Sequence, residues 1–151
     1  MDGISEILAT YNCVSLDEKI QFELDGVVEK EIKQAYCIEN LEFCVSCMDY
    51  TTLKVSDTEE SVKNFTADLL KKLKKFNLRD VAAVCVFSNY AGIVREGLKG
   101  TEIQTAVVAG NFPNSQTFTE IKLAECKMAI GAGAQEVDVV ISVGDILEKN
   151  Y

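Results

Sequence analysis

The spacing of apolar residues changes near residue 40 and predicts two kinds of structure. Before that point, apolar positions recur at intervals of three and four from Leu16 to Tyr36. This spacing predicts an amphipathic helix, which Gly26 weakens. We expect residues 1–40 to form an N-terminal helical extension that packs on a domain and carries no site.

From Leu41 onward, short apolar runs alternate with longer amphipathic segments. The apolar runs predict buried strands at residues 41–48, 81–87, 103–109 and 137–142. The segments between them predict helices that begin at Asp57 or Thr58, near Tyr90, and at Thr117 or Thr119. Strands that are apolar on both faces and alternate with helices indicate an α/β fold, a parallel sheet covered by helices. Both the doubly wound open sheet and the (β/α)8 barrel have this pattern, and periodicity does not choose between them.

The composition limits the kinds of molecule that we expect the protein to bind. The net charge is −9, from 24 acidic and 15 basic residues, so the surface repels nucleic acid and anionic membranes. A phosphorylated small molecule stays possible, because backbone N–H groups can build a phosphate site. No apolar run approaches the length of a membrane span, and no signal peptide is visible. We therefore expect a cytoplasmic protein whose six cysteines are reduced thiols.

The sequence contains no histidine, which excludes a histidine triad or a histidine metal site in this stretch. Cys44 and Cys47 have CxxC spacing, but the pattern places them within a strand, on opposite faces, so we expect no redox or metal role. Lys54 and Lys122 are the lysines nearest the carboxyl ends of the strands. We expect Lys122 to be a solvated side chain early in a long helix.

Asp138 is the unusual residue of the fourth predicted strand, because valine flanks it on both sides. A carboxylate in a buried strand is costly unless a partner compensates its charge. It is then either a structural aspartate paired with a lysine or backbone N–H, or an acid/base group whose pKa is tuned by burial. Position alone leaves both interpretations open.

The sequence carries four motifs in register, MDYTTL (48–53) followed by DTEE (57–60), AAVCVF (82–87), GNFP (110–113) with the helix that carries Glu125, and GAQEVDVV (133–140). Together they resemble the deoxyribose-phosphate aldolase family, and the match covers roughly residues 41–151. The helical N-terminal extension resembles the longer subgroup of that family. Tyr50 stands where many members have histidine, which puts no catalytic role in doubt.

This resemblance implies a parallel (β/α)8 TIM barrel, of which residues 41–151 form the first half, about four βα units. It implies reversible cleavage of 2-deoxy-D-ribose 5-phosphate to glyceraldehyde 3-phosphate and acetaldehyde through a lysine Schiff base, with no cofactor and no metal. Asp138 matches the family's catalytic aspartate. We assign substrate binding to the first two strands, at Asp49, Thr51, Leu53 and Cys85.

The resemblance also places the Schiff-base lysine on a sixth strand and an assisting lysine on a seventh, both beyond Tyr151. None of the lysines in this sequence matches them, so we expect residues 1–151 to be inactive alone. A half barrel would also expose two strand edges, which predicts self-association. Two other hypotheses remain: a non-catalytic doubly wound domain that binds a phosphorylated ligand or a protein partner, and a different aldolase or isomerase barrel. A doubly wound domain would carry helices on both faces of its sheet, whereas a half barrel would carry them all on one.

Overall fold

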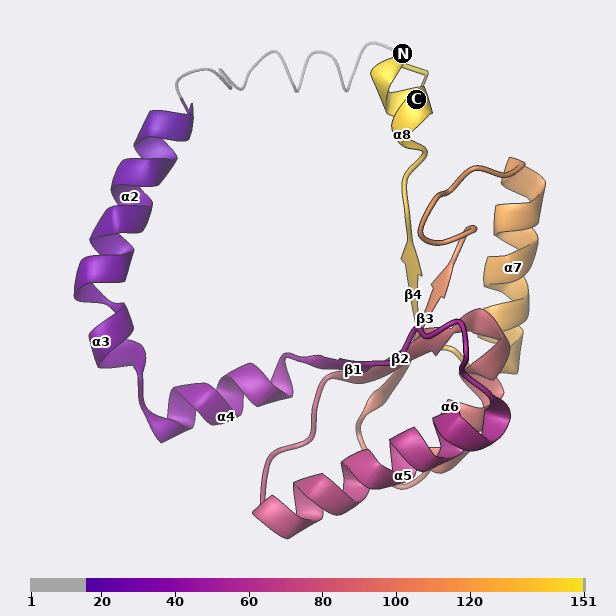
Figure 1. Ribbon diagram of the computed structural model, residues 1–151, viewed down its shortest axis with the longest axis horizontal. Helices are drawn as coiled ribbons and strands as arrows, with labels where there is room; N and C mark the ends of the chain where they lie inside the picture. Colours follow the sequence, from indigo (N-terminus) through magenta and orange to yellow (C-terminus); the bar gives the residue numbers. More distant parts are fainter. Residues whose placement is uncertain (1–15, 151) are drawn as a thin grey trace. The chain divides into compact units, whose positions relative to one another are not determined.

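Helices come first in the computed structural model of the protein, which describes residues 16–150 (Figure 1). The predicted N-terminal helix is present as α2 (Leu16–Lys30) and the short α3 (Ile32–Ala35), with a break at Glu31. These helices belong to a compact unit that ends at Leu41, and Glu42–Asn150 form a second unit. That residues 1–40 make a separate domain stays a prediction.

The first predicted strand is wrong over most of its length. Ile38–Ser46 form helix α4, and the strand β1 is limited to Asp49–Thr51. A short apolar run fits a helix as well as a strand, and here Val45 packs against the core while Phe43 is 61% exposed. A one-sided contact of this kind suits a helix, whereas a strand buried on both faces would cover every apolar residue of the run.

The remaining elements follow the predicted order, with bounds that differ by a few residues. They are α5 (Glu59–Phe76), β2 (Ala83–Phe87), the 3-10 turn η2 (Ser88–Tyr90), α6 (Ala91–Gly97), β3 (Gln104–Ala109), α7 (Thr119–Ala132), β4 (Glu136–Val139) and α8 (Val143–Leu147). Thr58 caps α5, and its side chain and that of Ser61 exchange hydrogen bonds with each other's backbone N–H. Gly133, with a φ of 113°, ends α7.

The four strands form one parallel sheet in the order β1-β2-β3-β4. A doubly wound sheet reverses its strand order at a switch point, and this sheet has no reversal. Sequential order is the arrangement of a (β/α)8 barrel. Within residues 16–150, β1 pairs only with β2 and β4 only with β3, so both are edge strands, as a half barrel requires.

The two faces of the sheet differ in what covers them. On one face, Val84, Val86 and Val107 pack with apolar side chains of all three connecting helices, namely Val62, Leu69 and Leu73 of α5, Val94 of α6 and Ala129 of α7. On the other face, Ala83, Cys85, Ala106 and Val108 are packed only by Leu53, Phe87 and Phe112, which come from strands and loops. The three connecting helices α5, α6 and α7 therefore lie on one face (Figure 1), which confirms the barrel prediction and argues against the doubly wound alternative.

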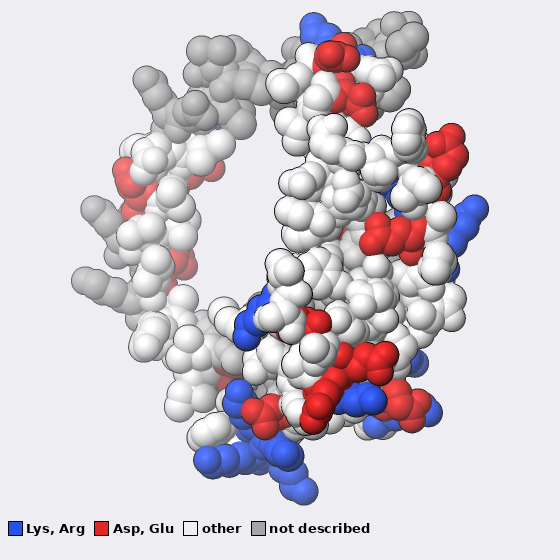
Figure 2. Space-filling view, turned by 45° about the vertical axis from the view of Figure 1, so that its right-hand side comes forward, with Lys and Arg blue, Asp and Glu red and all other residues white. Residues whose placement is uncertain are grey.

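Surface charge is uneven over this unit. Figure 2 shows blue side chains gathered at one end of the molecule, where α5 ends with Lys74 and Lys75 in its last turn. Cations suit the negative end of a helix dipole, so this cluster stabilises the helix end. Among residues 16–150, none of the helices is both long enough and apolar enough to cross a membrane.

Candidate functional site

The helix-free face of the sheet brings together four of the five predicted site residues. Strand side chains alternate between faces, and register pairs Asp49 with Ala83 and Thr51 with Cys85, so Asp49 and Thr51 share the face of Cys85. Asp138 of β4 lies on the same face, because it pairs with Val108 of β3. The fifth residue, Leu53, follows β1 and packs against the same cluster.

Cys85 and Asp138 are in direct contact. The Cys85 thiol donates a hydrogen bond to Asp138 Oδ2, at a sulfur–oxygen distance of 3.9 Å. Cys85 is 3% exposed, and this burial raises its pKa, as do the negative charges of Asp138 and Asp49. A hydrogen bond from Thr51 opposes them, and the pKa rises from 9.0 to about 11. The thiol is therefore neutral at pH 7 and serves as a hydrogen-bond donor, not as a nucleophile.

Asp138 is exposed among residues 16–150, where β4 is the edge strand of the sheet. The prediction took valine neighbours as evidence of burial. Val137 does pack against the helix-covered core, but the aspartate side chain points to the opposite face, where no strand beyond β4 is described. Its carboxylate is thus open to solvent on one side and bonded to a thiol on the other. Such a group can exchange protons with a ligand that enters this face.

The loop after β1 is fixed by Asp57. Its carboxylate oxygen Oδ2 accepts hydrogen bonds from Thr52 Oγ1 and from Lys54 N, each at 2.9 Å. The Tyr90 hydroxyl donates to the Asp57 carbonyl oxygen at 2.6 Å. The sequence offered Asp57 as an alternative helix cap, but Thr58 is the cap. Asp57 instead holds the segment that carries Leu53, and Lys54 is exposed beside it.

Lys122 is not a solvated side chain, so that expectation is wrong. Its ammonium donates hydrogen bonds to Ser115 Oγ at 2.8 Å and to Ser142 Oγ at 2.6 Å (distances from Nζ). Ser115 in turn donates to the carbonyl oxygen of Val140. Lys122 therefore ties α7 to the loop before it and to the segment after β4. Periodicity missed this role because both serines lie in loops, whose positions a helix pattern does not predict.

Cys44 and Cys47 are also placed differently from the prediction. Cys44 lies in α4 and Cys47 follows its end, and both side chains are exposed. A helix C-terminus disfavours a thiolate, so this site lacks the activation of redox cysteines at helix N-termini. Among the residues that the structure describes, no three histidine, cysteine, aspartate or glutamate side chains cluster in a way that could hold a metal ion.

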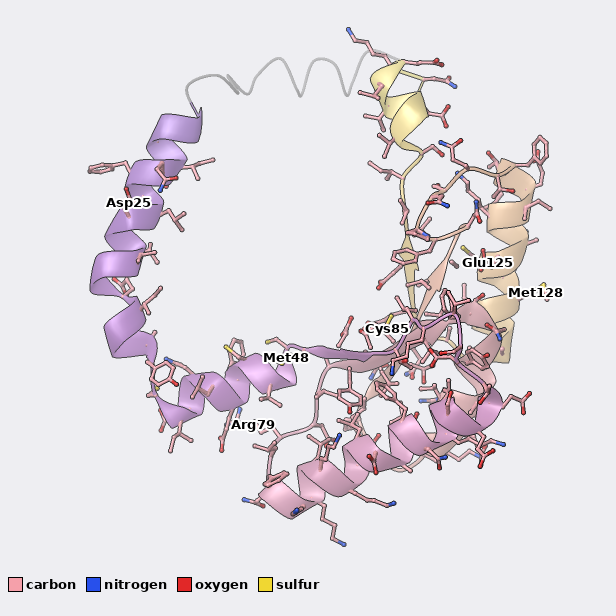
Figure 3. The ribbon with its side chains drawn as sticks, in the orientation of Figure 1. Asp25, Met48, Arg79, Cys85, Glu125 and Met128 are labelled. Carbon is pink, nitrogen blue, oxygen red and sulfur yellow. The ribbon has the colours of Figure 1, made fainter. Side chains whose placement is uncertain are left out.

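Glu125 is a site-forming residue to which the sequence assigned no role. It lies between α7 and the carboxyl end of β3 (Figure 3), where its carboxylate accepts bonds from the ends of both β2 and β3. The available signal was its spacing, since Glu125 comes one helical turn after Lys122 and both face the sheet.

Comparison with curated proteins places the chain beside two clostridial enzymes. The deoxyribose-phosphate aldolases of Clostridium novyi (strain NT) and Clostridium tetani (strain Massachusetts / E88) are 43% and 40% identical to it over 104 residues, which is 69% of this chain. Those residues are 43% and 44% of the two relatives, so the chain spans less than half of their length. No family model matches the sequence.

Solved structures give the same result for the fold. A Coccidioides immitis protein assigned as a deoxyribose-phosphate aldolase matches with a TM-score of 0.62 and 27% identity, over 73% of this chain and 40% of that one. The tetrameric deoxyribose phosphate aldolase of Aeropyrum pernix matches with a TM-score of 0.55 and 27% identity, over 68% of this chain and 41% of that one.

Proposed function

We propose, because the chain belongs to the deoxyribose-phosphate aldolase family, that it supplies the proton-transfer aspartate and part of the substrate pocket of such an aldolase. The reaction is the reversible cleavage of 2-deoxy-D-ribose 5-phosphate to D-glyceraldehyde 3-phosphate and acetaldehyde. The observation that carries this proposal is the position of Asp138. Its carboxylate lies on the helix-free face beside Cys85, with Asp49 and Thr51 of β1 on the same face.

Cleavage requires an amine and a proton carrier. A lysine amine condenses with the substrate aldehyde at C1 and releases water, and the resulting iminium accepts the electron pair of the C2–C3 bond when that bond breaks. A base removes the proton of the 3-hydroxyl, the C2–C3 bond breaks, and glyceraldehyde 3-phosphate leaves. The enamine that remains takes a proton at C2, and water then releases acetaldehyde and the lysine. We assign these proton transfers to Asp138, acting through water.

The Schiff-base lysine lies outside residues 1–151 in this proposal. Lys54 is exposed beyond β1, the Lys122 ammonium donates hydrogen bonds to two serine hydroxyls, and the family resemblance assigns the Schiff-base role to neither. Residues 1–151 alone should therefore form no covalent adduct when substrate and borohydride are added. A trapped lysine within this sequence would contradict the assignment.

The edges of the half barrel support a proposal about assembly. Val139 and Ile141, on and just after the edge strand β4, are 51% and 64% exposed. Uncovered apolar side chains beside unpaired backbone groups favour pairing with another chain. We propose that residues 1–151 self-associate through these edges. Light scattering should give a mass above that of one chain, and Ile141→Lys should lower it. A wild-type monomer at high micromolar concentration would contradict the proposal.

A chimera tests the proposed activity. Residues 42–150 replace the matched segment of the Clostridium novyi aldolase, which then supplies the remaining βα units. The chimera should cleave 2-deoxy-D-ribose 5-phosphate, and borohydride should trap a lysine of the clostridial segment. A chimera that is folded by circular dichroism and thermal unfolding, yet inactive and not trapped, would contradict the proposed function.

A further inference from the structure

The carboxylate of Glu125 joins two loops of the candidate site. Its Oε1 accepts a hydrogen bond from the Ser88 hydroxyl at 2.8 Å, directly after β2. Its Oε2 accepts from the backbone N–H groups of Gly110 and Asn111, at 2.9 and 3.1 Å, directly after β3. One side chain of α7 thereby fixes the carboxyl ends of the two central strands, where ligands bind in folds of this class.

The backbone at these two residues turns in a way that needs this acceptor. Gly110 has a φ of 73° and Asn111 a φ of 62°, so two consecutive residues adopt the left-handed conformation. This arrangement points both N–H groups at one oxygen. The chain then brings Phe112 onto the helix-free face, where it packs against the cluster that contains Cys85. Without Glu125, both N–H groups lose their hydrogen-bond acceptor. The strain of the left-handed backbone at Asn111 is then no longer offset by a hydrogen bond.

We propose that Glu125 is a positioning residue, which acts through the Gly110–Asn111 turn to hold Phe112 against the buried cluster that contains Cys85, the residue in contact with Asp138. This inference rests on the proposed function for its meaning, since it concerns the walls of the same site. The positioning role itself can be tested without measuring turnover. The geometry sets Glu125 apart from other residues of α7, because Met128 is 75% exposed and points away from the sheet (Figure 3), and Glu120 is exposed in the first turn.

Two substitutions separate the role of the acceptor from that of packing. Glu125→Leu keeps similar bulk and removes both acceptor oxygens. Glu125→Gln keeps the arrangement, because its carbonyl oxygen can accept the two N–H groups while its amide donates to a reoriented Ser88 hydroxyl. The Glu125→Gln variant should therefore keep the Gly110–Asn111 turn that the Glu125→Leu variant loses. Glu120→Leu is the matched control, an exposed carboxylate on the same helix.

The experiment is residue-specific alkylation of the full chain with iodoacetamide, followed by peptide mapping. In the wild type, buried Cys85 should react far more slowly than exposed Cys44. Glu125→Leu should raise the Cys85 rate about tenfold by opening the turn, with Cys44 unchanged, while Glu125→Gln and Glu120→Leu stay within about twofold. An unchanged Cys85 rate in Glu125→Leu, or a Gln variant as fast as the Leu variant, would overturn the proposal.

A measurement on the wild type covers the case in which Glu125→Leu unfolds. Unfolding would raise the alkylation rate of Cys126 in α7 together with that of Cys85. Hydrogen exchange of the wild-type chain then decides, because the Gly110 and Asn111 amides should exchange at least about tenfold more slowly than the free-chain rate. Exchange of both amides at the free-chain rate would overturn the proposal. Neither readout involves substrate, so an inactive chimera would leave this inference standing.

Discussion

Cys85 and Asp138 are joined by a thiol–carboxylate hydrogen bond of 3.9 Å across a strand that neither of them belongs to. Cys85 is in β2 and Asp138 in β4, and β3 lies between them. Cys85 is level with Ala106 of β3 and Asp138 with Val108, two residues further on, so the contact runs diagonally across β3. This contact therefore depends on three neighbouring strands.

Removing the charge of Asp138 should lower the pKa of Cys85. Burial is the largest cause of the raised pKa of about 11, and repulsion by Asp138 is the next. Asp138→Asn abolishes that repulsion, so the thiolate should form at lower pH. The pH dependence of Cys85 alkylation, read by peptide mapping, measures the change. A Cys85 pKa that stays unchanged or rises in Asp138→Asn would show that the carboxylate does not act on the thiol.

Stability should fall at alkaline pH because of the same thiol. The pKa of Cys85 is 9.0 in the unperturbed state and about 11 in the folded chain. Above pH 9 the unfolded chain releases a proton that the folded chain retains, so deprotonation favours unfolding. The free energy of unfolding should drop by about 2 kcal/mol between pH 9 and 11. Urea unfolding should show this loss in the wild type and a smaller one in Cys85→Ala. Equal losses in the two chains would contradict the linkage.

Gly110→Ala should destabilise the chain more than Gly100→Ala. Both glycines have positive φ, 73° and 84°, so an added methyl strains both backbones. At Gly110 the new Cβ would also lie 2.9 Å from Val139 Cγ1, whereas at Gly100 no atom lies within 4 Å. The clash should add about 1–3 kcal/mol to the loss in unfolding free energy. Similar losses in urea for the two variants would mean that β4 moves aside freely.

Lys122→Met should loosen the segment after β4. The substitution removes two charge-assisted hydrogen bonds, to Ser115 and Ser142, and should cost about 1–3 kcal/mol of unfolding free energy. Lys127→Met is the control, because Lys127 is exposed on the same helix and should change stability by less than about 0.5 kcal/mol. Thermal unfolding compares the two. If Lys122→Met were as stable as Lys127→Met, the two hydrogen bonds of Lys122 would contribute no measurable free energy of unfolding, and the prediction would be wrong.

The sequence predicted much of this fold because its apolar spacing is strong where the elements are long. The helices α5 and α7 were visible as amphipathic segments, and they begin where expected, at Glu59 after the Thr58 cap and at Thr119. The strand predicted over residues 41–48 failed, because a short apolar run has no period of its own. Lys122 and Glu125 acquired their roles only in the structure, since their partners are loop atoms. Asp138 stood out as a carboxylate between two valines and the resemblance assigned its role, while its exposure depends on which strands flank it.

The most direct test of the central claim is the effect of Asp138→Asn in the chimera with the Clostridium novyi segment. Turnover of 2-deoxy-D-ribose 5-phosphate should fall by about a hundredfold or more, because proton transfer is lost. Borohydride should still trap the lysine adduct, since the amine is intact. Glu136→Gln, on the same exposed strand, should keep turnover within a few fold. An Asp138→Asn chimera that turns over as fast as its parent would contradict the assignment of Asp138 as the proton-transfer group.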